Sequence, residues 1–498
     1  MKRILKALTS RLFLTSVSLL IQFAIIFVLI AYFNSIFVYY YAFSLVLSLI
    51  LCVHAINKNT NSGYKIAWLL LILVLPIFGA TVYLMLETRF LSKKKKMLEI
   101  TYRIKDAFDN KSAPRVNDAH VGQQINYISE FAYTPPVKNT KSKYFSGGEV
   151  FLESLLSDLK AAEKSIYLEY FIIKRGYMWD EISRILVEKA KMGVDVRIIY
   201  DDIGSIGQIG ARDFREIKEA GGRVKVFNRF KPIISSIQNN RDHRKICVID
   251  TKIAYSGGIN VGDEYINLKE RFGYFKDSGI RLEGEGAYHF WVFFLTLWEF
   301  LTNERAELKK PSYEKIDEGI CQPYTDSPID REHVGENVYM NLISKAREYV
   351  YISTPYFVVD DEMLKIITNT AKRGVDVRII LPHVPDKRLV NQITKSYYLR
   401  LIDAGVKVYE YKKGFNHSKI VIADGEIATV GSVNFDYRSF YLSFECGVLL
   451  YNSSTINDIL NDYNNMLSES VKITSEMASA SLLTRLARAV LAAFSPLL

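Results

Sequence analysis

Apolar and polar positions divide the chain into two unlike parts. Three long apolar runs lie within residues 1–90, at Leu12–Phe33, Ile36–Val53 and Ile66–Leu86. No charged residue falls between the start of the first run and the end of the second. As helices rising ~1.5 Å per residue, the runs would extend about 33, 27 and 32 Å, and the hydrocarbon core of a bilayer is about 30 Å thick. The pattern therefore predicts a transmembrane region with two or three helices.

The topology of this region stays open. A cleaved signal peptide is the alternative for the first run, but the run exceeds the usual apolar core of about 7–15 residues and no A-x-A site follows it. A buried core helix is the alternative for the third run, and its length argues against that. With three spans, six Lys and Arg residues flank one side and seven the other, so the positive-inside rule does not fix the orientation. If one of the first two runs does not cross, both basic ends can face the cytoplasm.

After a segment predicted to be a polar linker, 91–140, short β-branched and aromatic runs alternate with helical patterns. Candidate strands include Val194–Tyr200 and Val375–Leu381, and candidate helices include Asp180–Lys191 and Asp361–Arg373. Strands that alternate with helices predict α/β domains whose sheets are largely buried.

This part of the chain also repeats itself. Segment 190–199, AKMGVDVRII, returns as AKRGVDVRII at 371–380. The period is too long for a solenoid. It indicates two tandem domains, 141–310 and 311–470, which we expect to pack about a pseudo-twofold axis. A site at that axis would take residues from both domains.

The last segment, 471–498, is predicted to hold an amphipathic helix. Its apolar residues Leu483, Leu486, Val490 and Phe494 recur at helical spacing, with Arg485 and Arg488 off that stripe. Such a helix either packs on the second domain or lies on a membrane surface, and the sequence does not choose between them.

The residues that carry chemistry fall in the same repeat. The first motif is His243, Lys245 and Asp250 followed by Asn260, and the second is His417, Lys419 and Asp424 followed by Asn434. Each member of the second motif lies 174 positions after its counterpart in the first. Composition alone predicts about 0.1 such triplets by chance, so two in register are not accidental.

The spacing indicates what each motif can do. His and Lys two positions apart on a strand face the same way, and the Asn can return to that place after a turn and a second strand. Two ammonium groups and two carboxamides would suit a phosphate oxyanion, and two imidazoles can divide the roles of nucleophile and acid/base. We expect no metal, because two lysines would repel a divalent cation. For Asp250 and Asp424, at strand ends, a structural hydrogen bond is the alternative to chemistry.

Composition narrows the classes of partner. The chain carries 64 Lys and Arg against 54 Asp and Glu, a net charge of +10. That balance favours nucleic acid, anionic lipid or a phosphorylated substrate. The four cysteines form no CxxC pair, which excludes a disulfide scaffold and a thiolate zinc site.

The paired HxKxxxxD motifs, each followed by G-[GS]-x-N, resemble the phospholipase D superfamily. The resemblance covers residues 145–470 and implies two tandem α/β/α sandwich domains of phospholipase D type. The hydrophobic N-terminal runs together with Thr354-Pro-Tyr-Phe357 and Asn434-Phe-Asp-Tyr-Arg-Ser439 are similar to bacterial cardiolipin synthases of that superfamily. This likeness implies a multi-pass protein of the bacterial cell membrane, with the catalytic domains expected at the cytoplasmic face.

The resemblance further implies phosphatidyl transfer between two phosphatidylglycerol molecules, without metal, nucleotide or other cofactor. It suggests His243 as the nucleophile that forms a phosphatidyl-histidine and His417 as the acid/base. Lys245, Lys419, Asn260 and Asn434 would bind the phosphate.

The same resemblance places an acidic residue behind each histidine, and Asp277 and Glu445 are the candidates. Ordinary strand-edge charges are the alternative for both. The second motif departs from the first in having Ser432 where the first has Gly258, a small change that should not upset the turn.

Two other functions stay open. One is a phospholipase D-type hydrolase, or a transferase that uses another head-group alcohol, because no residue reports which hydroxyl reaches the intermediate. The other is a membrane-tethered nuclease. Nucleic acid is not expected as a partner, since the basic residues lie mainly at the membrane end and no nucleic-acid module is visible. The oligomeric state is not predicted.

Overall fold

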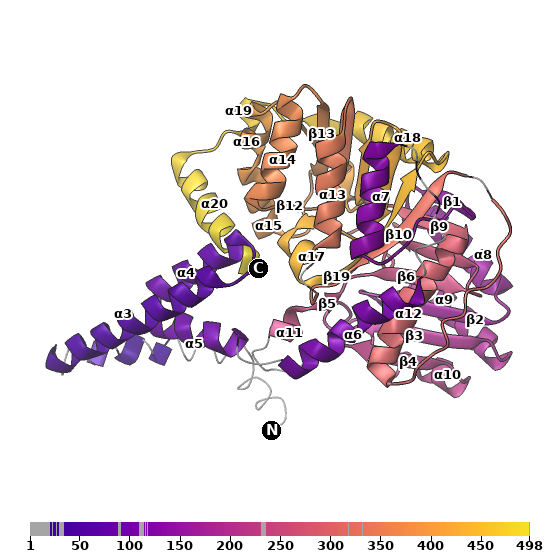
Figure 1. Ribbon diagram of the computed structural model, residues 1–498, viewed down its shortest axis with the longest axis horizontal. Coiled ribbons are helices and arrows are strands. Elements are labelled where there is room, and N and C mark those ends of the chain that lie inside the picture. The colour runs from indigo at the N-terminus through magenta and orange to yellow at the C-terminus, as the bar shows by residue number, and fades with distance from the viewer. Residues whose placement is uncertain are drawn as a thin grey trace. The chain divides into compact units, whose positions relative to one another are not determined.

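The computed structural model describes residues 34–87, 91–108, 118–230, 236–316, 318–330 and 332–497, together with isolated positions at 20–28, 114 and 116. The first predicted span, Leu12–Phe33, lies mostly outside the described residues, so it stays a prediction. The chain forms two compact units (Figure 1). One consists of residues up to 94 with 230–240 and 489–498, and the other of 95–229 and 241–488.

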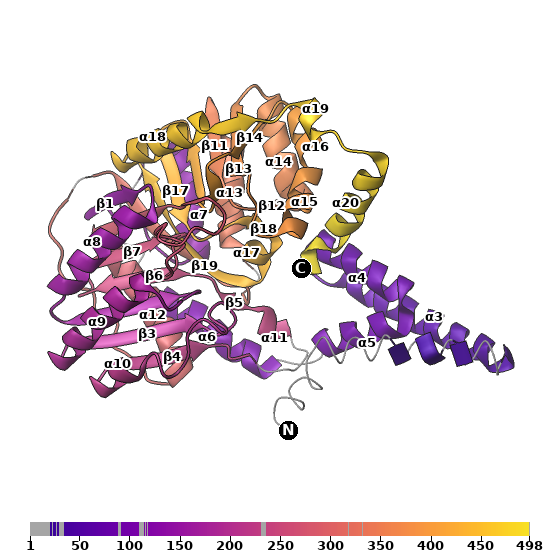
Figure 2. The ribbon, with the colours of Figure 1, turned by 180° about the vertical axis from the view of Figure 1, so that it is seen from behind.

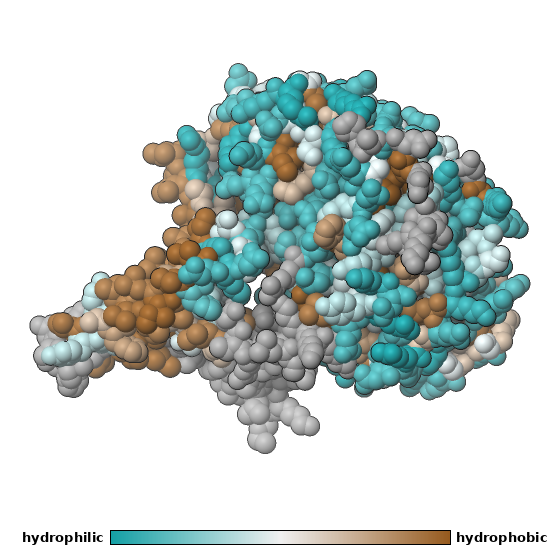
Figure 3. Space-filling model, viewed as in Figure 1, coloured by the Kyte–Doolittle hydropathy of each residue, from teal (hydrophilic) through white to brown (hydrophobic). Residues whose placement is uncertain are grey.

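Among the described residues of the first unit, three apolar helices follow one another along the chain. Helix α3 (Asn34–Asn57) covers the second predicted run, and its segment Val38–Asn57 is long and apolar enough to cross a membrane. Apolar side chains cover its surface (Figure 3), including Phe43, which is 65% exposed. Such a surface is stable in lipid and not in water, so the chain is membrane-associated.

The third predicted run is not the single helix that the sequence suggested. It forms α4 (Ser62–Val74) and α5 (Pro76–Glu87), which pack against each other and against α3. Pro76 lacks a backbone N–H and keeps Leu75 out of the helical region, at φ −128° and ψ 74°. At Gly79 a Cβ would lie 2.4 Å from the carbonyl oxygen of Leu71, so glycine permits the close packing of α4 and α5.

The predicted linker also contains two helices, α6 (Leu91–Ala107) and α7 (Ala119–Phe131). Helix α7 packs against α13 (Val334–Lys345) of the second repeat. It does so because Ile125 and Ile128 form an apolar stripe that is fully buried.

The first repeat has a seven-stranded sheet in the order β1-β9-β7-β6-β2-β3-β4. The strands are β1 (Thr140–Phe145), β2 (Ser165–Tyr170), β3 (Asp195–Asp201), β4 (Arg223–Phe227), β6 (Lys245–Ile249), β7 (Ile253–Gly257) and β9 (Gly279–Gly284). Helices α8 (Gly148–Ala161) and α9 (Tyr177–Lys191) cover one face and α12 (Glu285–Thr302) the other, while α10 (Arg215–Glu219) leads into β4. Strands β6 and β2 are almost wholly buried because helices cover both faces.

The second repeat has the same three layers. Its strands follow the order β10-β19-β17-β16-β11-β13-β14-β20. They are β10 (Ile320–Asp326), β11 (Tyr349–Ser353), β13 (Asp376–Pro382), β14 (Lys407–Tyr411), β16 (Ile420–Ala423), β17 (Ile427–Gly431), β19 (Ser443–Tyr451) and β20 (Ser470–Lys472). Helices α13 and α14 (Asp361–Lys372) cover one face and α18 (Thr455–Ser468) the other.

Smaller elements complete the second repeat and the tail. They are β12 (Phe357–Val358), β18 (Phe435–Asp436), α15 (Arg388–Ser396), α16 (Tyr398–Asp403), α17 (Tyr437–Tyr441), α19 (Ser475–Ala478) and α20 (Leu482–Phe494). The layers confirm the predicted α/β class with two tandem domains (Figures 1 and 2).

Two short strand pairs join the repeats. Strand β5 (Arg241–Asp242) pairs in parallel with β19 of the second repeat, and β15 (Gly414–Asn416) pairs in parallel with β8 (Tyr274–Lys276) of the first. The chain reaches a motif histidine directly after β5 and again directly after β15. Each histidine is therefore held by the backbone of the opposite repeat.

Candidate active site

Each motif histidine contacts an acid from the other repeat. His243 Nδ1 lies 2.9 Å from Glu445 Oε1, and its backbone N–H donates to the Phe444 carbonyl at 2.9 Å. His417 Nδ1 lies 2.6 Å from Asp277 Oδ2. The two carboxylates are fully buried. The structure thus brings both predicted acids to the histidines. Each acid contacts the histidine of the other repeat.

The two lysines occupy equivalent places beside the histidines. Lys245 and Lys419 are each 1% exposed, and each ammonium donates to the backbone carbonyl of the histidine two residues earlier. A buried ammonium is expensive unless an anion compensates it. Two such groups with two imidazoles form a centre suited to a phosphate.

Burial and the crowded cations shift the ionisation of this centre. Burial, with Lys245 and Lys419 adding to it, lowers the pKa of His243 well below its usual value. Burial and the Lys419 charge lower the pKa of His417 to about 4, against the opposing effect of Asp277. These shifts favour the neutral form of both imidazoles. An arriving phosphodiester anion would raise both pKa values and favour the imidazolium that an acid needs.

The lysines themselves titrate near neutrality. Burial lowers the pKa of Lys245 to about 8 and that of Lys419 to about 7. The ratio kcat/KM follows the ionisation of the free enzyme. We therefore expect kcat/KM to fall as pH rises through about 7 to 8, because the lysines lose charge. In Lys419→Arg the alkaline limb should move to higher pH, and an unchanged midpoint would contradict the assignment.

The two asparagines are less alike than the repeat suggests. Asn260 donates to the Tyr265 hydroxyl at 2.9 Å and accepts from the Ile172 N–H at 3.1 Å, so it is engaged with the fold. Asn434 is 5% exposed, and its carboxamide oxygen lies buried without a hydrogen-bond partner among the described residues. The Asn434 oxygen can accept from a hydroxyl of a ligand, whereas a phosphate oxyanion would have to bind the amide N–H groups.

The structure does not bring Asp250 and Asp424 to the site, which corrects their inclusion among the catalytic residues. The Asp250 carboxylate accepts from the backbone N–H groups of 163–165, and that of Asp424 from those of 347–349. Asp250 lies beyond the far end of β6, about 17 Å from Lys245 at ~3.3 Å per residue. Both aspartates have φ +53°, a conformation that Asp tolerates better than most residues. Asp250 links the end of β6 to the turn between α8 and β2, and Asp424 links the end of β16 to the turn between α13 and β11.

Loss of these hydrogen bonds should lower the stability of the fold and leave the catalytic rate nearly unchanged. Each carboxylate binds three amides, so Asp250→Ala or Asp424→Ala should lower the free energy of unfolding by about 2–4 kcal/mol. The catalytic rate per folded molecule should change less than about threefold. Thermal unfolding beside an initial-rate assay checks both, and a large rate loss at full stability would return these residues to the catalytic set.

The Gly258 and Ser432 difference has a specific consequence. The Ser432 hydroxyl donates to Glu445, the acid that holds His243. At Gly258 a Cβ would lie 2.1 Å from Asp277 Oδ1, where no side chain fits without moving the acid that holds His417. The two histidine–acid pairs are therefore supported differently.

The substitutions Gly258→Ser and Ser432→Gly should lower the catalytic rate by different amounts. Gly258→Ser should displace Asp277 from His417 and lower the transfer rate about 10–100-fold. Ser432→Gly removes one hydrogen bond from Glu445 and should cost about tenfold or less. Initial rates with circular dichroism as a folding control measure the difference, and equal losses would contradict it.

The site is lined by aromatic rings that the sequence patterns did not identify. The Phe171 ring lies 4.9 Å from the His243 ring, and the Tyr265 and Phe275 rings lie 5.7 and 5.3 Å from that of His417. These rings exclude water around the imidazoles, which strengthens local electrostatics. No spacing rule marks such residues, because they come together only in the fold.

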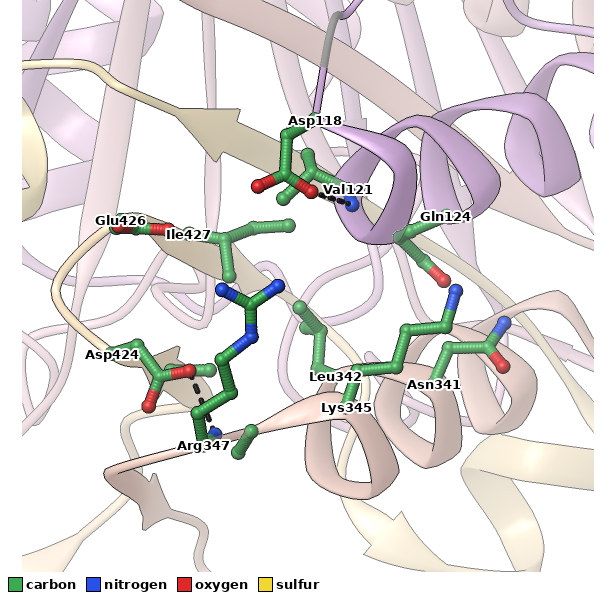
Figure 4. Close-up of a pocket in the computed structure, with 12 residues that line it drawn as sticks. Asp118, Val121, Gln124, Asn341, Leu342, Lys345, Arg347, Asp424, Glu426 and Ile427 are labelled. Atoms are coloured by element: carbon green, nitrogen blue, oxygen red, sulfur yellow. Dashed lines mark hydrogen bonds between the residues drawn. The ribbon is translucent and has the colours of Figure 1, made fainter.

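A pocket in the second repeat is separate from this site (Figure 4). It lies between α7, α13 and the turn after β16, and is lined by side chains that include Gln124, Lys345, Arg347 and Glu426. Asp424 is one of the residues that line the pocket, and it follows the end of β16 that is remote from His417. The pocket therefore lies at that remote end. Among the described residues, no group of three or more His, Cys, Asp or Glu residues could hold a metal ion.

Comparison with known proteins agrees with this geometry. The family model described as cardiolipin synthase, PLD-like domain, matches residues 155–277 and 339–467, and a phospholipase D-nuclease N-terminal model matches 46–86. An uncharacterized protein of Streptococcus mutans is 40% identical over 89% of this chain and 99% of its own length. Cardiolipin synthase 2 of Bacillus cereus is 33% identical over 84% and 83%. Phosphatidylserine synthase of Haemophilus influenzae shares the fold, with a TM-score of 0.57 at 13% identity, over 76% of this chain and 100% of that structure.

Proposed function

The chain belongs to the cardiolipin synthase family of phospholipase D-like proteins, and from that premise we propose that it converts two phosphatidylglycerol molecules into cardiolipin and glycerol. One observation carries the proposal: two buried histidines, each held by a carboxylate of the opposite repeat and each beside a buried lysine. The arrangement offers a nucleophile, an acid/base and positive charge for one phosphate.

In the first step, His243 is the nucleophile. Its Nδ1–H donates to Glu445, which leaves the Nε2 lone pair for attack on phosphorus. The N–P bond forms and the P–O bond to the head-group glycerol breaks. His417, protonated in the complex, gives its proton to the leaving alkoxide, so neutral glycerol departs. Lys245 and Lys419 stabilise the charge on the non-bridging oxygens.

In the second step, the acid becomes the base. Neutral His417 takes the proton of a glycerol hydroxyl on a second phosphatidylglycerol, and that oxygen attacks the phosphorus. The O–P bond forms, the N–P bond breaks and His243 is regenerated. Asp277 stabilises the imidazolium of His417 in both steps, which fits its position at 2.6 Å.

We further propose a multi-pass membrane protein whose catalytic repeats face the cytoplasm. Support comes from α3 and from α20, whose Leu482 and Leu483 are 82% and 77% exposed. Arg485 and Arg488 lie off the apolar stripe of Leu483 and Leu486, and Arg488 donates to Gln392 at 3.1 Å. An exposed apolar stripe with an arginine at its flank suits a helix lying in the headgroup region of anionic lipid.

A lipid product assay tests the function. Purified full-length protein in phosphatidylglycerol liposomes, without CTP or added metal, is followed by mass spectrometry of lipids and released glycerol. Equal amounts of cardiolipin and glycerol are expected. Phosphatidic acid as the main product would identify a hydrolase instead, and turnover only with another alcohol would identify a different transferase. Turnover of DNA alone would overturn the lipid assignment.

A further inference from the structure

The residue between His243 and Lys245 carries a buried charge that the two reaction steps do not use. Arg244 is 0% exposed, and successive side chains of an extended chain point to opposite sides. Its guanidinium therefore points away from the side that faces the phosphate. There its Nε donates to Asp242 Oδ1 at 3.1 Å and lies 2.7 Å from Glu169 Oε1. These three fully buried residues form a charged trio behind the first motif.

The equivalent positions of the second repeat, by sequence offset and by strand register, are neutral. They are Asn416, Ser418 and Ser353. The Asn416 amide donates to the Ser353 hydroxyl at 2.9 Å, and the Ser418 N–H donates to the Asn416 carboxamide oxygen at 3.2 Å. These residues are as fully buried as the charged trio, so the two repeats differ here in charge. Because buried charges are costly, their presence in one repeat points to a role that belongs to the first motif.

Arg244 also contacts the segment of the second repeat that holds His243. Its Cζ lies 5.6 Å from the centre of the Phe444 ring, and its Nη1 donates to the Thr325 hydroxyl at 3.4 Å. That hydroxyl donates in turn to the Glu445 carbonyl at 2.9 Å. The Phe444 carbonyl and the Glu445 carboxylate are the two groups that bind His243. Arg244 therefore reaches both of these residues, one directly and one through a single hydroxyl.

An attacking nitrogen needs such support more than a proton donor does. Displacement at phosphorus requires the nucleophile to lie in line with the leaving oxygen, and a misplacement of about 1 Å can cost about 100-fold in rate. Proton transfer can also run through one water. We propose that Arg244 is a positioning residue, which fixes the segment 444–445 and thereby holds Nε2 of His243 in line with the phosphorus. This inference rests on the proposed function and on His243 as its nucleophile.

Burst kinetics test this role, because they separate the number of active molecules from the speed of attack. The full-length His417→Ala protein is mixed with a phosphatidyl ester of p-nitrophenol, which needs no proton to release its phenolate. The burst amplitude then counts folded sites, and the burst rate constant measures attack by His243. Adding Arg244→Gln should lower the rate constant about 10–100-fold, because the nucleophile is no longer held in line. A smaller amplitude with an unchanged rate constant would show a role in folding alone and overturn the inference.

A second variant leaves the buried charges in place and avoids the risk that Arg244→Gln does not fold. Thr325→Val removes only the hydroxyl between Arg244 and the Glu445 carbonyl, and it should lower the rate constant about 3–10-fold in the same His417→Ala protein. Thr325→Ser should restore the rate constant. The combination of Thr325→Val with Arg244→Gln should be little slower than Arg244→Gln alone, because both act on one segment. Full additivity, or no effect of Thr325→Val, would contradict the proposed connection.

Arg281→Gln is the matched control for the loss of an arginine ion pair. Arg281 binds Asp158 at 2.7 Å away from the histidines, so the burst rate constant should stay within about twofold. Failure of the proposed function looks different, because the His417→Ala protein itself would then give no burst. A normal burst in that protein with an unchanged rate constant in both Arg244→Gln and Thr325→Val would overturn the positioning role alone.

Discussion

Replacing His243 with Ala should lower the rate of cardiolipin formation by about 10⁴–10⁶-fold, the range expected when a catalytic nucleophile is removed. The imidazole lies beside Lys245 and is held through Nδ1 by Glu445, so its loss removes the group that is placed to attack phosphorus. His417→Ala should cause a loss of similar size with the natural substrate, because the glycerol alkoxide cannot leave without a proton. Both rates are measured as initial rates of lipid product, with circular dichroism to show that the variants fold.

A substrate with an activated leaving group separates the two roles. A phosphatidyl ester of p-nitrophenol needs no proton to release its phenolate. His417→Ala should therefore give a burst of nitrophenolate equal to the enzyme concentration and accumulate the phosphatidyl-enzyme, while His243→Ala gives neither. The reverse result would exchange the roles of the histidines, and bursts from both variants would exclude a single nucleophile.

Neutralising either acid should have the second-largest effect. Glu445→Gln and Asp277→Asn keep the side-chain shape but weaken the hold on Nδ1 and allow the other imidazole tautomer, which should lower the rate about 10²–10⁴-fold. Glu445 belongs to the second repeat and acts on the histidine of the first. Rates and lipid products measured beside thermal unfolding distinguish this effect from loss of fold.

The pairing of each acid with the histidine of the opposite repeat can be tested more directly. In a double-mutant cycle, Glu445→Gln should add little to the loss already caused by His243→Ala, since both changes disable one unit. Asp158→Asn is the control, because this acid binds Arg281 and Tyr255 away from the histidines. Full additivity of His243→Ala with Glu445→Gln would contradict the pairing.

Local sequence patterns were sufficient to predict much of the architecture. The duplicated segment and the alternating runs predicted two α/β domains, because strand and helix periodicities are short-range properties of the chain. The same approach treated the third apolar run as one helix, since hydrophobicity outweighed the helix-breaking signal of Pro76 and Gly79. It also treated α7 as linker, although its buried stripe packs on α13.

The candidate chemistry of this protein could be predicted from the sequence, because two copies of the same His, Lys and Asn set stand in register along the chain. The tertiary structure alone decided which side chains meet. Asp277 and Glu445 could be named from the family resemblance, but only the β5–β19 and β8–β15 pairs assign each to the histidine of the opposite repeat. The structure likewise places the Asp250 carboxylate on the backbone N–H groups of 163–165, away from the centre. The physical reason is that contacts between residues some two hundred positions apart depend on how the two repeats pack, and no local spacing records that packing.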